Sequence, residues 1–72
     1  MVVHKNLIDV RRIRVQTGRS QYGFARLIGV SGAAVAAWEQ GRRKPSRLAR
    51  RMLALVDHNP SMFIEESARS RR

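Results

Sequence analysis

Serine and glycine divide the apolar pattern of this sequence into short segments, and this division constrains the fold more than any other feature. Ser20 and Ser31 each precede an apolar segment, where a helix N-cap is expected. Gly29 and Gly41 each follow one, where glycine ends a helix in the left-handed conformation. The sequence contains no cysteine, so no disulfide can stabilise the fold. We therefore expect short helices that are stabilised by packing against one another.

Apolar residues recur at helical spacing in five segments. Helices are expected near residues 7–16, 21–28, 32–40, 47–57 and 61–68. Leu7, Val10 and Ile13 define the apolar side of the first helix. Asn59 and Pro60 would start the last one, as its N-cap and its first helical residue.

The 72 residues accommodate one small domain, and no segment alternates in polarity with the period of a β-strand. The predicted class is therefore all-α, with four to five short helices forming a domain over residues 7–68. A short N-terminal arm over residues 1–6 and a basic tail over residues 69–72 would flank this domain.

Positive charge dominates the composition. Lysine and arginine total 15 against 5 aspartates and glutamates, a net charge of +10. Charge of one sign destabilises a compact chain by self-repulsion, so we expect it to serve the binding of a polyanion, with nucleic acid first. No segment approaches the roughly 18 apolar residues of a membrane-spanning helix, and the N-terminus lacks the apolar run of a signal peptide. We expect a soluble cytoplasmic protein with no membrane partner.

Ala25, Gly29 and Val35 have the spacing of two short helices that cross steeply. Ala25 supplies a small side chain where the helix axes approach, Gly29 permits the positive φ of a tight turn, and Val35 anchors the second helix in the core. This spacing is the helix-turn-helix pattern. Phe24 and Trp38 would fill the core beneath; the alternative is that their rings stack on single-stranded nucleic acid.

With these residues in place, the sequence resembles the Cro/phage-repressor (XRE-like) type of helix-turn-helix proteins. The resemblance rests on residues 20–25, 28–31 and 35–46, and the run from Trp38 through Ser46 is similar to HigA-type antitoxins. It implies a lambda-repressor-like domain in a sequence-specific, homodimeric transcriptional repressor that binds an inverted repeat in double-stranded DNA. Such a repressor would autoregulate a small bacterial, plasmid or phage operon, and an antitoxin would have a toxin protein as a further partner.

The resemblance also implies roles for individual residues. Helix 21–28 would cross the DNA backbone, and helix 32–40 would enter the major groove. The positions expected to face base edges are Ser31, Gly32, Ala33, Ala36 and Ala37. None of them is Arg, Asn or Gln, the side chains that best distinguish base pairs. We therefore expect contacts between alanine and thymine methyl groups, helped by the shape of the DNA.

Phosphate contacts are expected on both sides of this helix. The resemblance assigns them to Ser20, Gln21, Gln40, Arg42 and Lys44, and the surrounding basic cluster adds Arg43 and Arg47. Arg50 and Arg51 extend this cluster, and the alternative is that it only solubilises the fourth helix. Arg14 and Glu39 match a structural pair that ties the first helix to the end of the recognition helix. Glu39 is also the only acid between Asp9 and Asp57, and the alternative is a solvated side chain with no fixed partner.

Large apolar side chains near the C-terminus exceed what so small a core can cover. Leu55, Met62, Phe63 and Ile64 are candidates for a homodimer interface, and the alternative is that they close the monomer core over the first helix.

A non-specific basic nucleic-acid binder is the main alternative function, ahead of an amphipathic membrane peptide. His4 and His58 have no partners at metal-ligand spacing, so no metal is expected. No cofactor or enzyme activity is expected either, because no nucleophile and base converge.

Overall fold

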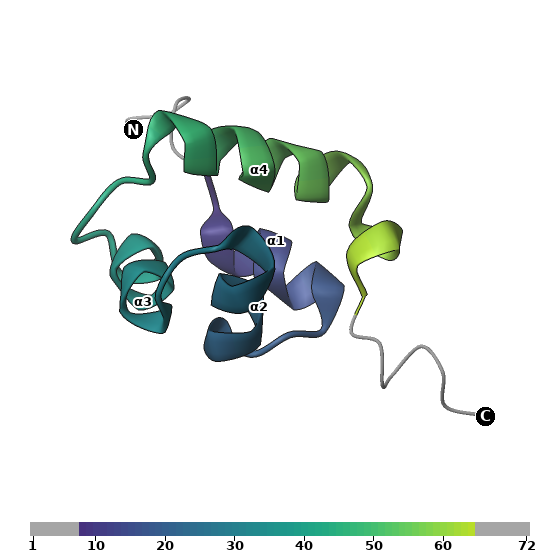
Figure 1. Cartoon of the computed structure of the whole chain (residues 1–72), viewed down its shortest axis with the longest axis horizontal. Coiled ribbons are helices and arrows are strands. Elements are labelled where there is room, and N and C mark those ends of the chain that lie inside the picture. The colour runs from purple at the N-terminus through teal and green to yellow at the C-terminus, as the bar shows by residue number, and fades with distance from the viewer. Residues whose placement is uncertain (1–7, 65–72) are drawn as a thin grey trace, which may run out of the picture.

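The computed structural model describes residues 8–64, which form four α-helices and one 3-10 helix (Figure 1). The elements are α1 (Val10–Thr17), α2 (Gln21–Ile28), α3 (Gly32–Gln40), α4 (Arg47–His58) and η1 (Pro60–Phe63). This part of the chain contains no strand, and the all-α class is confirmed. The arm expected over residues 1–6 and the tail expected over residues 69–72 lie outside the described residues.

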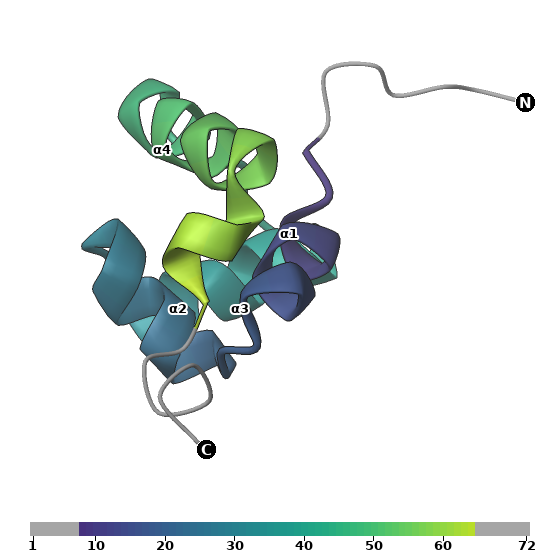
Figure 2. The same ribbon diagram turned by 90° about the vertical axis from the view of Figure 1, so that its right-hand side faces the viewer.

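The helices surround a single core. In Figure 1, α4 runs along the top of the molecule and the α2–α3 pair lies below it. Helix α1 contacts both α3 and α4, and η1 lies against α1 and α4 (Figure 2). The buried side chains that meet between them are Val10, Ile13, Phe24, Ala25, Val35, Leu53 and Val56. Phe24 is fully buried and Trp38 packs against the same cluster, so both rings serve the core and not a stacking platform.

Each α-helix begins at a residue whose side chain accepts a hydrogen bond from the backbone N–H three residues later. These N-caps are Asp9, Ser20, Ser31 and Ser46, with donor–acceptor distances of 3.0, 3.0, 3.0 and 3.1 Å. A cap of this kind satisfies one N–H group that the helix start leaves unpaired, and it contributes about 1 kcal/mol. The local sequence therefore defines where all four helices start.

The first helix begins later than its apolar pattern predicts. It was expected to start near residue 7, but α1 starts at Val10, because the Asp9 carboxylate accepts from the Arg12 N–H and caps it. Ile8 lies before the helix and still packs against the core. The apolar pattern thus extends beyond the helix, and Leu7 lies outside the described residues.

The α-helix expected near residues 61–68 is wrong over its described part. Pro60–Phe63 form a short 3-10 helix, and Ile64 is extended, with φ −66° and ψ 145°. The physical reason is the missing cap, because the Asn59 side chain makes no capping hydrogen bond and its backbone N–H still donates to the last turn of α4. Residues 65–68 lie outside the described part of the chain.

Candidate nucleic-acid interface

The α2–α3 pair forms a tight helical corner. Helix α2 ends at Gly29, whose φ of 92° is in the left-handed region that favours glycine. The N–H groups of Gly29 and Val30 both donate to the Ala25 carbonyl, at 2.8 and 2.9 Å. Ala25 and Val35 are 1% and 0% exposed, so both helices are anchored in the core on either side of the turn. This geometry leaves the opposite side of α3 available to a ligand.

Four of the five residues expected to face bases lie on that side of α3. Ser31 and Ala33 are exposed, and Gly32 and Ala36 are half-buried. Ser31 also caps α3, because its hydroxyl oxygen accepts from the Ala34 N–H at 3.0 Å. The accessible surface at the start of α3 therefore consists of a hydroxyl, backbone and alanine methyl groups, with no charged side chain.

The fifth expected base contact, Ala37, is wrong. Its side chain is only 3% exposed, so it cannot reach a base edge. Helix α3 packs against α1 as well as α2, so more of its circumference is covered than its own spacing predicts. The chain also turns after Gly41, at the end of α3. There the N–H groups of Arg42 and Arg43 donate to the Ala37 carbonyl, at 2.9 and 3.4 Å. Helical periodicity alone does not reveal this turn.

Gln40 and the basic residues expected to contact phosphate gather at the C-terminal end of α3 and the start of α4. Those that the structure leaves exposed are Gln40, Arg42, Arg43, Lys44 and Arg47. The Arg42 guanidinium donates from Nε to Gln40 Oε1 at 2.7 Å, which orients that guanidinium at the end of α3. Arg51 is also exposed on α4, one helical turn after Arg47 and on the same side of the helix.

On the other side of α3, the two expected phosphate contacts are engaged within the protein. The Ser20 hydroxyl oxygen caps α2 by accepting from the Gly23 N–H at 3.0 Å. Gln21 is half-buried, and its Nε2 donates to Glu39 Oε1 at 2.9 Å. Ser20 keeps an exposed hydroxyl, whereas the Gln21 amide is held inside the α2–α3 corner.

Arg14 and Glu39 form the structural pair that the resemblance implies. Arg14 Nε donates to Glu39 Oε2 at 2.6 Å and its NH2 group donates to Oε1 at 3.1 Å, which makes the pair bidentate. Their side chains are 15% and 6% exposed. The third guanidinium nitrogen of Arg14 donates to the Arg19 carbonyl at 3.0 Å, in the connection between α1 and α2. Together with Gln21, this network joins α1, α2 and α3.

The same network shifts the pKa values of both partners in the direction that strengthens the pair. The hydrogen bonds from Arg14 lower the pKa of Glu39 below its ordinary value, against the opposing effect of burial, and Gln21 lowers it further. The hydrogen bonds to Glu39 raise the pKa of Arg14. Glu39 is therefore ionised at neutral pH, and its charge is directed into the protein and away from the exposed side of α3.

The apolar candidates for a dimer interface divide into two groups. Leu55 and Met62 are 55% and 68% exposed, so the monomer does not cover them. Phe63 and Ile64 are half-buried, and Phe63 packs against the core. The Phe63 carbonyl also accepts from Arg19 Nε at 3.0 Å, which fastens η1 to the α1–α2 connection. Phe63 therefore closes the monomer core, as the alternative interpretation has it.

Two further contacts were not predicted from the sequence. The Arg12 guanidinium makes a bidentate pair with the Asp57 carboxylate at 3.1 and 3.2 Å, linking α1 to α4. Arg26 lies over the Tyr22 ring, with 5.9 Å from the guanidinium carbon to the ring centroid. The first pair spans 45 positions and leaves no local signal. The second has the i, i+4 spacing of neighbours on a helix, which could have predicted it.

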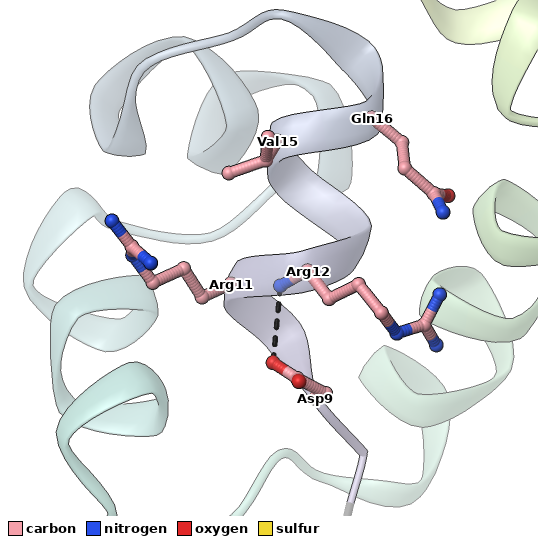
Figure 3. Close-up of a pocket in the computed structure, with 5 residues that line it drawn as sticks. All are labelled: Asp9, Arg11, Arg12, Val15 and Gln16. Carbon is pink, nitrogen blue, oxygen red and sulfur yellow. Dashed lines mark hydrogen bonds between the residues drawn. The ribbon is translucent and has the colours of Figure 1, made fainter.

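Helix α1 also carries a shallow hollow on its outer side, lined by Asp9, Arg11, Arg12, Val15 and Gln16 (Figure 3). The side chains of Arg11 and Arg12 extend to opposite sides of α1. Within residues 8–64, no three side chains of the metal-binding types cluster, and none of the helices is long and apolar enough to span a bilayer.

Comparison with known proteins gives two matches. The helix-turn-helix family pattern matches residues 10–48, which is more than half of the chain. The HTH-type transcriptional regulator YiaG of Escherichia coli, from strain K12 and two others, is 37% identical over 54 residues. These residues are 75% of this chain and 56% of the relative, so the chain spans little more than half the length of these curated relatives. No solved structure matches the chain significantly.

Proposed function

The chain belongs to the helix-turn-helix family, and from this premise we propose that it is a DNA-binding transcriptional regulator whose α3 enters the major groove of a duplex. One observation carries the proposal. The exposed side of α3 is uncharged, while exposed basic residues from Arg42 to Arg47 follow directly at its end. An uncharged α-helix fits into the major groove, and basic side chains beside it can pair with the phosphates that border the groove.

In its finer form, the proposal is a sequence-specific repressor that reads thymines through methyl contacts. Ala33 and Ala36 are the accessible methyl groups, and Ser31 adds one hydroxyl. Bidentate side chains at these positions would each contribute about 1–3 kcal/mol of discrimination, so their absence shifts specificity toward close fit and DNA shape.

A selection from random DNA tests this form. Fragments that bind the protein are enriched and sequenced, and the expected motif is a thymine-rich inverted repeat with half-site centres about 10–11 base pairs apart. If about 5–8 phosphates are neutralised, log K falls with log salt at a slope near −5 to −7. Failure to enrich any motif would reject sequence-specific repression.

A homodimer on DNA is supported by the uncovered side chains of Leu55 and Met62. Leu55→Asp is expected to leave the monomer fold intact, because the side chain is 55% exposed, and to weaken binding to the full repeat by tenfold or more. Binding to a single half-site should not change. Equal loss on the half-site and the full repeat would reject this interface.

Non-specific nucleic-acid binding is the second candidate, and the lack of Arg, Asn or Gln among Ser31, Gly32, Ala33 and Ala36 favours it. Competition with excess random DNA separates the two functions. A specific regulator keeps a preference of about 10³-fold or more for its site, whereas a non-specific binder is displaced in proportion to competitor.

We further propose that the protein acts in the cytoplasm of a bacterium and represses its own operon. The gene would lie on the chromosome, a plasmid or a phage. This hypothesis predicts that the selected repeat lies upstream of the gene for this chain. The antitoxin form further predicts that the product of the neighbouring reading frame co-purifies with this protein when the two are expressed together. A repeat found only elsewhere would reject autoregulation, and a neighbour that does not bind would reject the antitoxin form.

A further inference from the structure

Tyr22 is a large aromatic side chain that the fold does not bury. It is 68% exposed on α2, and the Arg26 guanidinium lies 5.9 Å from the centre of its ring. Within residues 8–64, neither the Tyr22 hydroxyl nor the Arg26 guanidinium makes a hydrogen bond to protein. Two hydrogen-bond donors, one of them charged, are thus held together at the surface without a protein acceptor.

This pair lies beside the start of α3. A Cβ atom built on Gly32 would lie 3.9 Å from both Cα and Cδ1 of Tyr22, which is ordinary van der Waals contact. The phenol therefore flanks the exposed surface formed by Ser31 and Ala33. Gln21, the neighbouring residue expected to contact phosphate on this side, donates its amide to Glu39 instead.

We propose that Tyr22 and Arg26 form a phosphate clamp at the N-terminal end of α3. The inference rests on the proposed function and deepens it, because it gives the recognition helix a backbone contact at the end opposite the basic residues Arg42 to Arg47. The Tyr22 hydroxyl and the Arg26 guanidinium both donate to phosphate oxygens of the strand that passes the start of α3. Stacking on the ring restricts the arginine before binding, so less side-chain entropy is lost when it meets the phosphate.

Phosphate contacts and base contacts leave different signatures. Loss of a phosphate contact weakens binding by the same factor on every sequence and lowers the salt slope by about 0.9, whereas loss of a base contact alters the preference between sequences. The pair is therefore tested on two duplexes, the repeat enriched by selection and a random duplex of the same length. Each is titrated over a series of salt concentrations.

Arg26→Gln is expected to weaken binding by about tenfold at 0.1 M salt on both duplexes and to make the slope shallower by about one. Arg26→Lys should keep the slope, because it keeps the charge. Tyr22→Phe keeps the ring and loses only the hydroxyl, and is expected to weaken binding by about two- to tenfold on both duplexes. Arg12→Gln, the same change on α1 at a guanidinium that is already paired with Asp57, is the matched control and should leave the slope unchanged.

Melting temperatures of all four variants should match that of the unmodified chain, because the three side chains are exposed. If Arg26→Gln and Tyr22→Phe bind as tightly as the unmodified chain, or if their losses occur on the selected repeat alone, the clamp is overturned while the proposed function stands. If the unmodified chain binds neither duplex, the proposed function fails together with the clamp.

Discussion

Helices α3 and α4 lie in the same small domain and differ in almost every surface property. Glu39 is the only charged residue of α3, and it is directed inward to Arg14. Helix α4 carries three exposed arginines and leaves Leu48 and Leu55 uncovered. The exposed surface of α3 is therefore uncharged, whereas α4 exposes both positive charge and apolar side chains.

This difference indicates a division of work between the two helices. In the proposed function, the charge-free surface of α3 contacts base edges through its shape, and the cations beyond its ends supply affinity that does not depend on sequence. The one acidic side chain of α3, Glu39, is paired with Arg14 at 2.6 Å, so it adds no free negative charge to the exposed side of the helix.

The largest effect is expected from a carboxylate placed on each helix in turn. Ala33→Glu puts a negative charge among phosphates, where like charges cost several kcal/mol, so binding should fall by about 100-fold or more with no change in melting temperature. Ala54→Glu makes the same change on the exposed side of α4 and should reduce binding much less. Equal losses in a binding titration would remove the contrast between the helices.

Ala37→Glu should act differently from Ala33→Glu, although both residues are in α3. Ala37 is 3% exposed, so the new carboxylate would be buried without a partner and should lower the free energy of unfolding by about 3 kcal/mol. Urea denaturation followed by circular dichroism measures this change. An unaltered midpoint would mean that Ala37 faces solvent after all.

The ion pairs of the two helices should also differ. Glu39→Ala leaves Arg14 mostly buried without its carboxylate, and we expect a loss of about 3 kcal/mol in unfolding free energy. Asp57→Ala removes the exposed pair between α4 and Arg12, whose side chains are 38% and 50% exposed, and should barely move the urea midpoint. A larger effect at Asp57 than at Glu39 would contradict this ranking.

Acid should weaken the α3 network specifically. The pKa of Glu39 is lower in the folded chain than its ordinary value near 4.5, so the unfolded chain takes up this proton first. Its contribution is full at neutral pH and is lost as the pH falls below about 4.5 toward the folded pKa. Melting temperatures measured from pH 7 to pH 3 should fall less steeply in Glu39→Gln than in the unmodified chain. Parallel curves would show that Glu39 is not the group that titrates.

The smallest effects are expected from the caps. Ser31→Ala and Ser46→Ala each remove one capping hydrogen bond and should cost about 1 kcal/mol of unfolding free energy. Only Ser31→Ala should also weaken binding beyond this loss of stability, because Ser31 lies on the side of α3 that we propose enters the groove. The same binding loss in both variants would contradict a role of Ser31 in DNA binding beyond its role as a cap.

The helices could be predicted from the sequence where their signals are local. Ser20, Ser31 and Ser46 are caps that act over three residues, and Gly29 permits the left-handed turn by itself. Apolar spacing alone was a poorer guide, because Ile8 packs on the core without being helical.

The candidate site was predictable only in part, because several of its determinants lie far apart in the chain. Nothing near Gln21 indicates that Glu39, 18 positions later, would engage its amide. Ala37 is buried in a helix that packs against both α1 and α2, which the spacing within α3 does not reveal. The last helix was mispredicted for a local reason, the cap that Asn59 does not make. The Tyr22–Arg26 pair has a local signal, the i, i+4 spacing on α2, but that spacing alone does not show that both side chains are exposed.

The most direct measurement follows alanine methyl groups in the complex. With alanine methyls labelled with ¹³C, intermolecular nuclear Overhauser effects to a thymine-rich duplex report which helix touches the bases. We predict effects from Ala33 and Ala36 to thymine methyl protons and none from Ala54, which is exposed on α4. Effects from Ala54, with Ala33 and Ala36 silent, would contradict the account.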